Sequence, residues 1–163
     1  MRTAERALHR SRQLFGALRP RVDAERRAEA VALLRDGERR LFASMTPRDQ
    51  QHCLDVYARL RATSSDDRDL LVAALLHDAG KGRVALWHRV VYVLLAARAP
   101  RLLDRAAAPG EGDGWRQALY RCRHHEALGA QLARAAGATA RVAALIAGDD
   151  VPGQAALTAA DDA

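Results

Sequence analysis

The chain has 163 residues, a net charge of +6, 49% apolar and only 4% aromatic residues, which suits one mainly helical domain with a core of its own. Acidic residues lie between the scattered arginines and no recognised binding motif is present, so the composition argues against a nucleic-acid partner. The apolar stretch 90–97 is too short to cross a bilayer and the N-terminus lacks the apolar segment of a signal peptide, so we expect a soluble cytoplasmic protein with no membrane partner.

Apolar periodicity, caps and breakers predict a succession of helices joined by short connections. The predicted helices cover residues 4–18, 23–35, 47–62, 84–98, 101–107, 115–123, 126–137, 139–148 and 154–162. One more predicted helix begins at a cap in residues 64–66 and ends at the turn at residues 80–82. Thr46 followed by Pro47 is a strong start signal. Residues 38–45 are a connection and 108–114 a flexible loop in this prediction. We interpret the aromatic side chains as core or groove-lining residues: Trp87, Tyr92, Trp115 and Tyr120.

An apolar run, Leu70–Leu76, ends directly at His77 and Asp78. At helical spacing this run is apolar on every side, which is typical of a buried helix. A carboxylate there is costly to bury unless a metal ion or an opposite charge offsets it. Lys81, the only lysine in the chain, follows three residues later. The segment LLHDAGKG therefore invites a functional interpretation.

Histidines and carboxylates recur at the ends of different predicted helices: His52, His77-Asp78, His124-His125, Asp149-Asp150 and Asp161-Asp162. Helix ends that converge on one cleft could supply three or four nitrogen and oxygen ligands. Such a set suits a divalent ion, namely Fe, Mn, Co, Ni, Zn or Mg. Cys53 and Cys122 lie far apart without a CxxC neighbour, so we interpret them as reduced core thiols and not as ligands of a structural zinc ion.

The pattern His…His-Asp…Asp resembles the HD superfamily of metal-dependent phosphohydrolases. The residues that carry it are His52 in PRDQQHCLDV, His77 and Asp78 in LLHDAGKG, and Asp161 in LTAADDA, with a later segment HHEALGA. HDAGK is the specific HDxGK form of the central motif. The resemblance covers residues 41–163. It implies an all-α HD-domain helical bundle over that range, preceded by an N-terminal helical extension over residues 1–40.

The resemblance implies a metal site whose ligands are His52, His77, Asp78 and Asp161. His125 and Asp149 are further candidate ligands. Catalytic roles are implied for Asp78 at the metal, for Lys81 as a point charge on a substrate phosphate, and for His125 as a second-site ligand or general acid. A divalent ion bound there would polarise a phosphoryl oxygen and lower the pKa of its water. Asp149 or Asp150 could replace Asp161 near the chain end, where helices fray, but the AAD context favours Asp161.

Gly148 and Asp149 stand where two-metal members of the superfamily carry further histidines, and the GYP motif of one such group is missing. Two functions therefore follow from the resemblance, and a third, a nucleic-acid-directed phosphodiesterase, is supported only by the positive charge. The first is a metal-dependent phosphohydrolase acting on a phosphate ester or anhydride, such as a nucleotide or dinucleotide. The alternative is a catalytically weakened HD domain that binds a nucleotide or a protein partner. The expected substrate is a small phosphorylated molecule, and the sequence gives no signal of oligomeric state.

Overall fold

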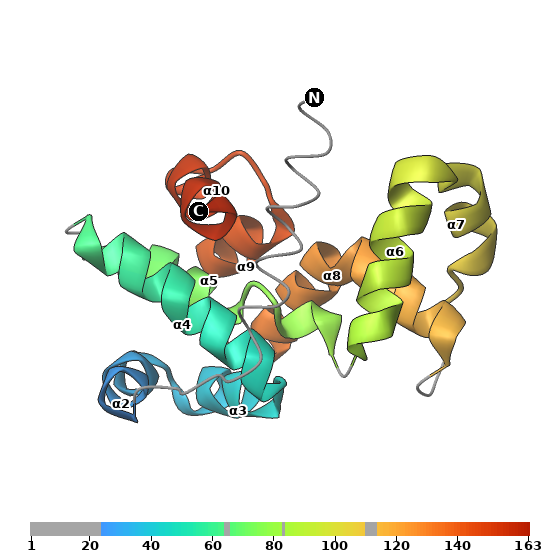
Figure 1. The fold of residues 1–163 in the computed structure, drawn as a ribbon. Coiled ribbons are helices and arrows are strands. Elements are labelled where there is room, and N and C mark those ends of the chain that lie inside the picture. The colour runs from blue at the N-terminus through green and yellow to red at the C-terminus, as the bar shows by residue number, and fades with distance from the viewer. Residues whose placement is uncertain (1–23, 64–65, 83, 110–113) are drawn as a thin grey trace.

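The computed structural model describes residues 24–63, 66–82, 84–109 and 114–163 (Figure 1). These ranges contain α-helices, one short 3-10 helix and no strand, so the predicted all-α class is confirmed. The elements are α2 (Ala24–Leu33), α3 (Asp36–Ser44), α4 (Pro47–Ala62), α5 (Arg68–Leu76), η1 (Ala79–Lys81), α6 (Leu86–Arg98), α7 (Pro100–Ala106), α8 (Trp115–Ala135), α9 (Ala140–Ala147) and α10 (Gln154–Asp162). No helix in the described ranges is both long and apolar enough to cross a membrane.

The local start signals predict several helices well. The Thr46 hydroxyl accepts a hydrogen bond from the Asp49 amide and Pro47 occupies the first turn of α4, as expected. The prediction was wrong for residues 38–45, which belong to α3 and not to a connection. The cap of α5 is Asp67, one residue beyond the predicted 64–66. The predicted helix 4–18 and residue 23, where the second predicted helix begins, lie outside the described residues.

The apolar run at Leu70–Leu76 forms the centre of the protein. All seven of its side chains are buried, which explains why α5 is apolar on every side. It packs against α4 and α9, and α10 lies across α4 and α5 (Figure 1). Helix α8 packs against α9 and against η1, the turn that follows α5. The end of α5 is therefore surrounded by other helices, and the His77-Asp78 pair lies at that end.

Helix α3 spans the predicted boundary at residue 40, and α2 lies before it. Ala30, Leu34 and Phe42 are buried in the same apolar cluster as α4, α5 and α9. Nothing tests whether residues 1–40 act as a separate extension, so that division stays a prediction. The described part of this segment is nevertheless packed on the main core.

Helices α6 and α7 form a hairpin that projects from the other helices and packs mainly against α8 (Figure 1). Within the described residues, the main apolar cluster contains no side chain of either helix. Trp87 and Trp115 were expected to be core or groove-lining residues, but both are exposed. The expectation was wrong because an apolar helix face is buried only where another element covers it. No described part of the chain covers α6 at Trp87 or the start of α8 at Trp115.

Asp67 fixes the start of the helix that leads to the His77-Asp78 pair. Its carboxylate accepts a hydrogen bond from the Leu70 amide and two from the Arg141 guanidinium of α9, at 2.8 and 2.5 Å. The Arg141 hydrogen bonds are the main cause that lowers the pKa of Asp67, against a smaller opposing effect of burial. One side chain therefore caps α5 and ties it to α9.

We predict that Asp67→Ala lowers the free energy of unfolding by about 1 kcal/mol through loss of the cap. Asp67→Asn should cost less, because asparagine also caps helices and only the ion pair is lost. Because the pKa of Asp67 is lower in the folded protein than in the unfolded chain, the ion pair stabilises the folded protein fully at pH values above the unfolded pKa of about 4. This stabilisation is lost as the pH falls through the folded-state pKa of Asp67. The stability difference between wild type and Asp67→Asn in urea unfolding should therefore shrink at acid pH. A difference that stays constant with pH would contradict this assignment.

Candidate metal centre

Four side chains from three separate segments converge on one point. His52 lies in the middle of α4, His77 and Asp78 follow α5, and Asp161 lies in the last turn of α10. The His52 Nε2–H donates to Asp161 Oδ1 at 2.7 Å. His77 Nε2 lies 3.3 Å from His52 Nε2 and 3.4 Å from Asp161 Oδ1. These donor atoms lie close enough together to ligate a single ion.

The imidazole of His77 is oriented by its own helix. Its Nδ1–H donates to the Ala74 carbonyl oxygen at 2.8 Å, which leaves Nε2 directed at His52 and Asp161. Metal-bound histidines commonly show this arrangement, in which the distal ring N–H is held by a carbonyl and the other nitrogen ligates.

Asp78 is 2% exposed and surrounded by positive or ionisable groups. Its Oδ1 lies 2.6 Å from Lys81 Nζ and 3.4 Å from His77 Nε2, and its Oδ2 lies 4.0 Å from His52 Nε2. The Lys81 ammonium therefore compensates the Asp78 carboxylate. A buried carboxylate this close to two histidine nitrogens is also placed to ligate a cation.

The electrostatics of the cluster favour positive charge at its centre. Burial raises the pKa of Asp78, but His77, Lys81 and His52 outweigh it and the pKa is lowered. Hydrogen bonds from His52 and His77 lower the pKa of Asp161 far below its usual range. Burial lowers the pKa of His77, whereas Cys53, Asp161 and Asp78 raise it, and the net pKa is well above the usual value. The carboxylates of Asp78 and Asp161 therefore favour a positive charge at the centre of the cluster.

A second group, Cys53 with His77 and Asp78, also lies within ligating distance. The Cys53 sulfur lies 3.6 Å from His77 Nδ1. The N–H at that nitrogen already donates to the Ala74 carbonyl oxygen. Burial raises the pKa of the Cys53 thiol, so the thiolate needed for ligation is disfavoured. The His52–His77–Asp161 group, with Asp78 beside it, is the better donor set. This agrees with the interpretation of Cys53 as a core thiol; both cysteines are free.

Asp161 is held in place although it lies in the last turn of α10. Leu157 and Ala160 of this helix are buried against the core. The Arg59 guanidinium of α4 donates to the Ala160 carbonyl oxygen at 2.9 Å. These contacts oppose the fraying that was the reason to consider Asp149 or Asp150 instead.

The other candidates occupy different positions. Lys81 contacts Asp78 directly. His125 lies on α8 beside η1; its Nδ1–H donates to the Cys122 carbonyl, and burial and the charge of Lys81 lower its pKa. Within the described residues, His125 makes no hydrogen bond or ion pair with His52, His77 or Asp161. Asp149 and Asp150 are exposed after α9 and do not join the cluster.

Neighbouring His124 has non-helical backbone angles, φ −112° and ψ 17°, so α8 is kinked at the break predicted between helices 115–123 and 126–137. Its ring packs against Tyr120, and not into the cluster.

Sequence reasoning missed two arginines near the cluster. Arg48 lies four residues before His52, on the same side of α4, at about 6 Å along the helix axis. Arg89 of α6 donates two hydrogen bonds of 2.8 Å to the buried Asp49 carboxylate. Burial and the neighbouring Arg89 lower the pKa of Arg48, while Asp49 and Asp78 partly oppose this. The four-residue spacing from His52 was the one signal available for Arg48.

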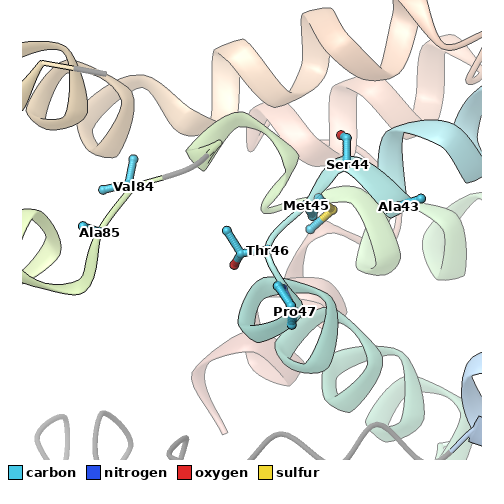
Figure 2. A pocket seen from close by; sticks show the side chains of 7 residues that line it. All are labelled: Ala43, Ser44, Met45, Thr46, Pro47, Val84 and Ala85. Atoms are coloured by element: carbon cyan, nitrogen blue, oxygen red, sulfur yellow. The ribbon is translucent and has the colours of Figure 1, made fainter. Parts of the chain in front are cut away.

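A hollow of about 680 Å³ lies between the start of α4 and the segment before α6 (Figure 2). One wall is the turn between α3 and α4, and the other is the segment before α6. Figure 2 shows Thr46 and Pro47 on the first wall and Val84 and Ala85 on the second. Pro47, on the first wall, lies five residues before His52 on α4, about 7.5 Å along the helix axis. No residue of the cluster lines it.

In comparisons with known proteins, no family model, no curated protein and no solved structure matches this chain. The geometry of the cluster therefore stands by itself.

The backbone of η1 touches that of α8 at Gly80. A Cβ built there would lie 2.0 Å from the His125 carbonyl oxygen and 2.6 Å from the Gly129 amide nitrogen. Both are backbone atoms, so neither can move aside cheaply. This contact sets the distance between Lys81 and α8.

We predict that Gly80→Ala destabilises the protein by about 3 kcal/mol or prevents folding, because it overpacks a backbone contact. Gly114→Ala is the matched control: a Cβ there meets nothing within 4 Å and φ is −64°. Gly114 is the N-cap of α8, where alanine is a poorer cap than glycine, so the control should cost no more than about 1 kcal/mol. Thermal and urea unfolding measure both. Equal stabilities of the two variants would contradict the close approach.

Proposed function

We propose that this chain is a metal-dependent phosphohydrolase of the HD type, acting on a phosphate ester or anhydride of a nucleotide or another small phosphorylated molecule. The observation that carries the proposal is the convergence of His52, His77, Asp78 and Asp161. Asp161 and His52 are separated by 109 residues, yet their side chains are hydrogen-bonded. The motif resemblance selected these same residues from the sequence.

The residues fit a divalent cation. Two imidazole nitrogens and two carboxylates form a mixed donor set without sulfur, which suits the hard and borderline ions Mn, Fe, Co, Ni, Zn and Mg. The hydrogen bond from His77 to Ala74, which leaves Nε2 directed at His52 and Asp161, and the burial of Asp78 beside His77 support the same conclusion. When bound, such an ion would polarise a phosphoryl oxygen and lower the pKa of a coordinated water.

The chain's own cations would bind the substrate phosphate. Lys81 lies beside Asp78 with its ammonium at the edge of the cluster. Arg48 makes no hydrogen bond or ion pair within the described residues, and it lies near Arg89. An anion beside Arg48 would relieve the repulsion between two guanidinium groups. The adjacent hollow would hold the organic part of the substrate.

A neutral His125 imidazole would act as a metal ligand or proton acceptor more readily than as a proton donor. Its lowered pKa favours the neutral imidazole, and its Nδ1–H is engaged by Cys122, so that Nε2 carries the free lone pair. Of the two roles that the resemblance implies, this favours the ligand.

The alternative function is a catalytically weakened HD domain that binds a nucleotide or a partner. One observation favours it: Asp149 is exposed and away from the cluster, so it adds no ligand for a second ion in the described structure. An HD domain with one ion and no hydrolysis would match this arrangement.

The first prediction concerns metal content. His52→Gln and Asp161→Asn should each weaken binding of Mn²⁺ or Ni²⁺ more than about tenfold, because loss of a ligand costs at least as much as loss of its supporting group. His124→Gln, which alters a histidine packed on Tyr120, should bind as wild type does. Calorimetric titration and metal analysis measure this, with circular dichroism to verify folding. Wild-type protein that binds no divalent ion, or equal binding by all four proteins, would overturn the proposal.

The second prediction concerns hydrolysis. With metal present, wild type should cleave at least one member of a panel of nucleoside mono- and triphosphates, dinucleotides and aryl phosphodiesters. Arg48→Gln should raise KM by about tenfold with little change in kcat, because one charge-assisted hydrogen bond to phosphate is lost. Arg40→Gln, at an exposed position of α3, is the matched control. Metal and nucleotide binding without turnover of any substrate would support the weakened binding domain instead.

A further inference from the structure

Exposed apolar side chains are concentrated on the hairpin of α6 and α7. Seven large apolar residues are exposed in the described structure, and five of them lie on this hairpin. They are Trp87 (57%), Val90 (40%), Val93 (47%), Leu94 (51%) and Leu102 (55%). Single exposed apolar residues are common, but a contiguous group on adjoining helices marks a contact surface.

The exposed residues of α6 share one face. Val90, Val93, Leu94 and Ala97 follow the i, i+3, i+4, i+7 spacing and all are exposed. Trp87 lies one turn before Val90, on the same side. Only 4% of the residues are aromatic, so an exposed tryptophan at the edge of an apolar face is unusual in this chain. We call the surface formed by this face together with Leu102 the hairpin patch.

Positive charge flanks the hairpin patch. Arg98, Arg101 and Arg105 are exposed and make no side-chain hydrogen bond or ion pair within the described residues. The one acidic residue in the hairpin, Asp104, pairs with Arg123 of α8. The patch therefore combines an apolar face with three uncompensated cations.

This charge pattern discriminates between occupants. A symmetric dimer would place the patch against its own copy and bring the three arginines of each chain together. An anionic lipid surface satisfies both features, because its acyl region accepts the apolar side chains and its headgroups attract the arginines. Helix α6 has 13 residues and is about 20 Å long, shorter than a hydrocarbon core of about 30 Å. It can therefore lie along an interface.

We propose that the α6–α7 hairpin binds the surface of anionic membranes, inserting Trp87, Leu94 and Leu102 at headgroup depth while Arg98, Arg101 and Arg105 contact lipid phosphates. The proposed contact is peripheral, since no helix of the described ranges is long and apolar enough to cross a membrane. The proposal is independent of the metal centre, since no residue of the cluster belongs to the hairpin.

The test is sedimentation of the full chain with vesicles of phosphatidylcholine alone or mixed with phosphatidylglycerol. Wild type should bind the mixed vesicles at least tenfold more strongly. Leu94→Ser/Leu102→Ser should abolish most binding. Arg101→Gln/Arg105→Gln should weaken it roughly 30-fold, as two surface cations predict. Arg40→Gln/Arg134→Gln removes the same charge from exposed positions outside the hairpin and should change binding only a few-fold.

Tryptophan fluorescence gives a second readout. The chain has two tryptophans, so Trp115→Phe leaves Trp87 as the only reporter. Its emission should shift to the blue with anionic vesicles and stay unchanged with phosphatidylcholine alone.

Three results would overturn the proposal. The first is no binding to mixed vesicles by folded wild-type protein. The second is equal weakening by both arginine pairs, which would indicate attraction by net charge alone. The third is a wild-type dimer that Leu94→Ser/Leu102→Ser dissociates while vesicles are not bound, which would assign the patch to a second copy of the chain.

Discussion

The structure depends on the burial of one carboxylate, that of Asp78. A charged group at the end of a wholly apolar helix is stable only when positive groups surround it. Lys81 reaches it from the next turn, His77 precedes it, and His52 approaches from α4. Each of these neighbours requires a particular placement of its own element. The packing of α4 against α5 and the tight turn η1 follow from apolar burial. They are also required to keep the Asp78 carboxylate charged while it is buried.

Backbone contacts hold the same region from the other side. Gly80 lets η1 approach α8 so closely that a single methyl group would not fit. Arg59 fixes the end of α10, and Arg141 with Asp67 fixes the start of α5 against α9. The cluster is thus built from side chains whose helices are each anchored elsewhere. Preorganisation of this kind is what a metal site or a phosphate site requires.

Sequence reasoning succeeded where the signal is local or strongly energetic. Thr46-Pro47 defined the start of α4, and the apolar run before Asp78 indicated a buried helix with an unusual charge. The placement of Asp161 beside His52 came from a motif resemblance; no local pattern indicates that α10 crosses α4. The pair Asp49–Arg89 joins residues 40 positions apart, so only the packing of α6 near α4 shows it. The exposure of Trp87 was missed for a related reason: apolar periodicity gives the face of a helix but does not say whether the chain covers that face.

The separation of the hairpin from the main core has a consequence for local stability. Regions that share few buried contacts with the rest of a protein open on their own, at a lower free energy than global unfolding. The amides of α6 and α7 belong to such a region, whereas those of α5 lie at the centre of the core. The hairpin could thus open and close as one cooperative unit while the histidines and carboxylates stay assembled. The buried ion pair between Arg89 and Asp49 links the two units, and its strength sets how far their openings are coupled.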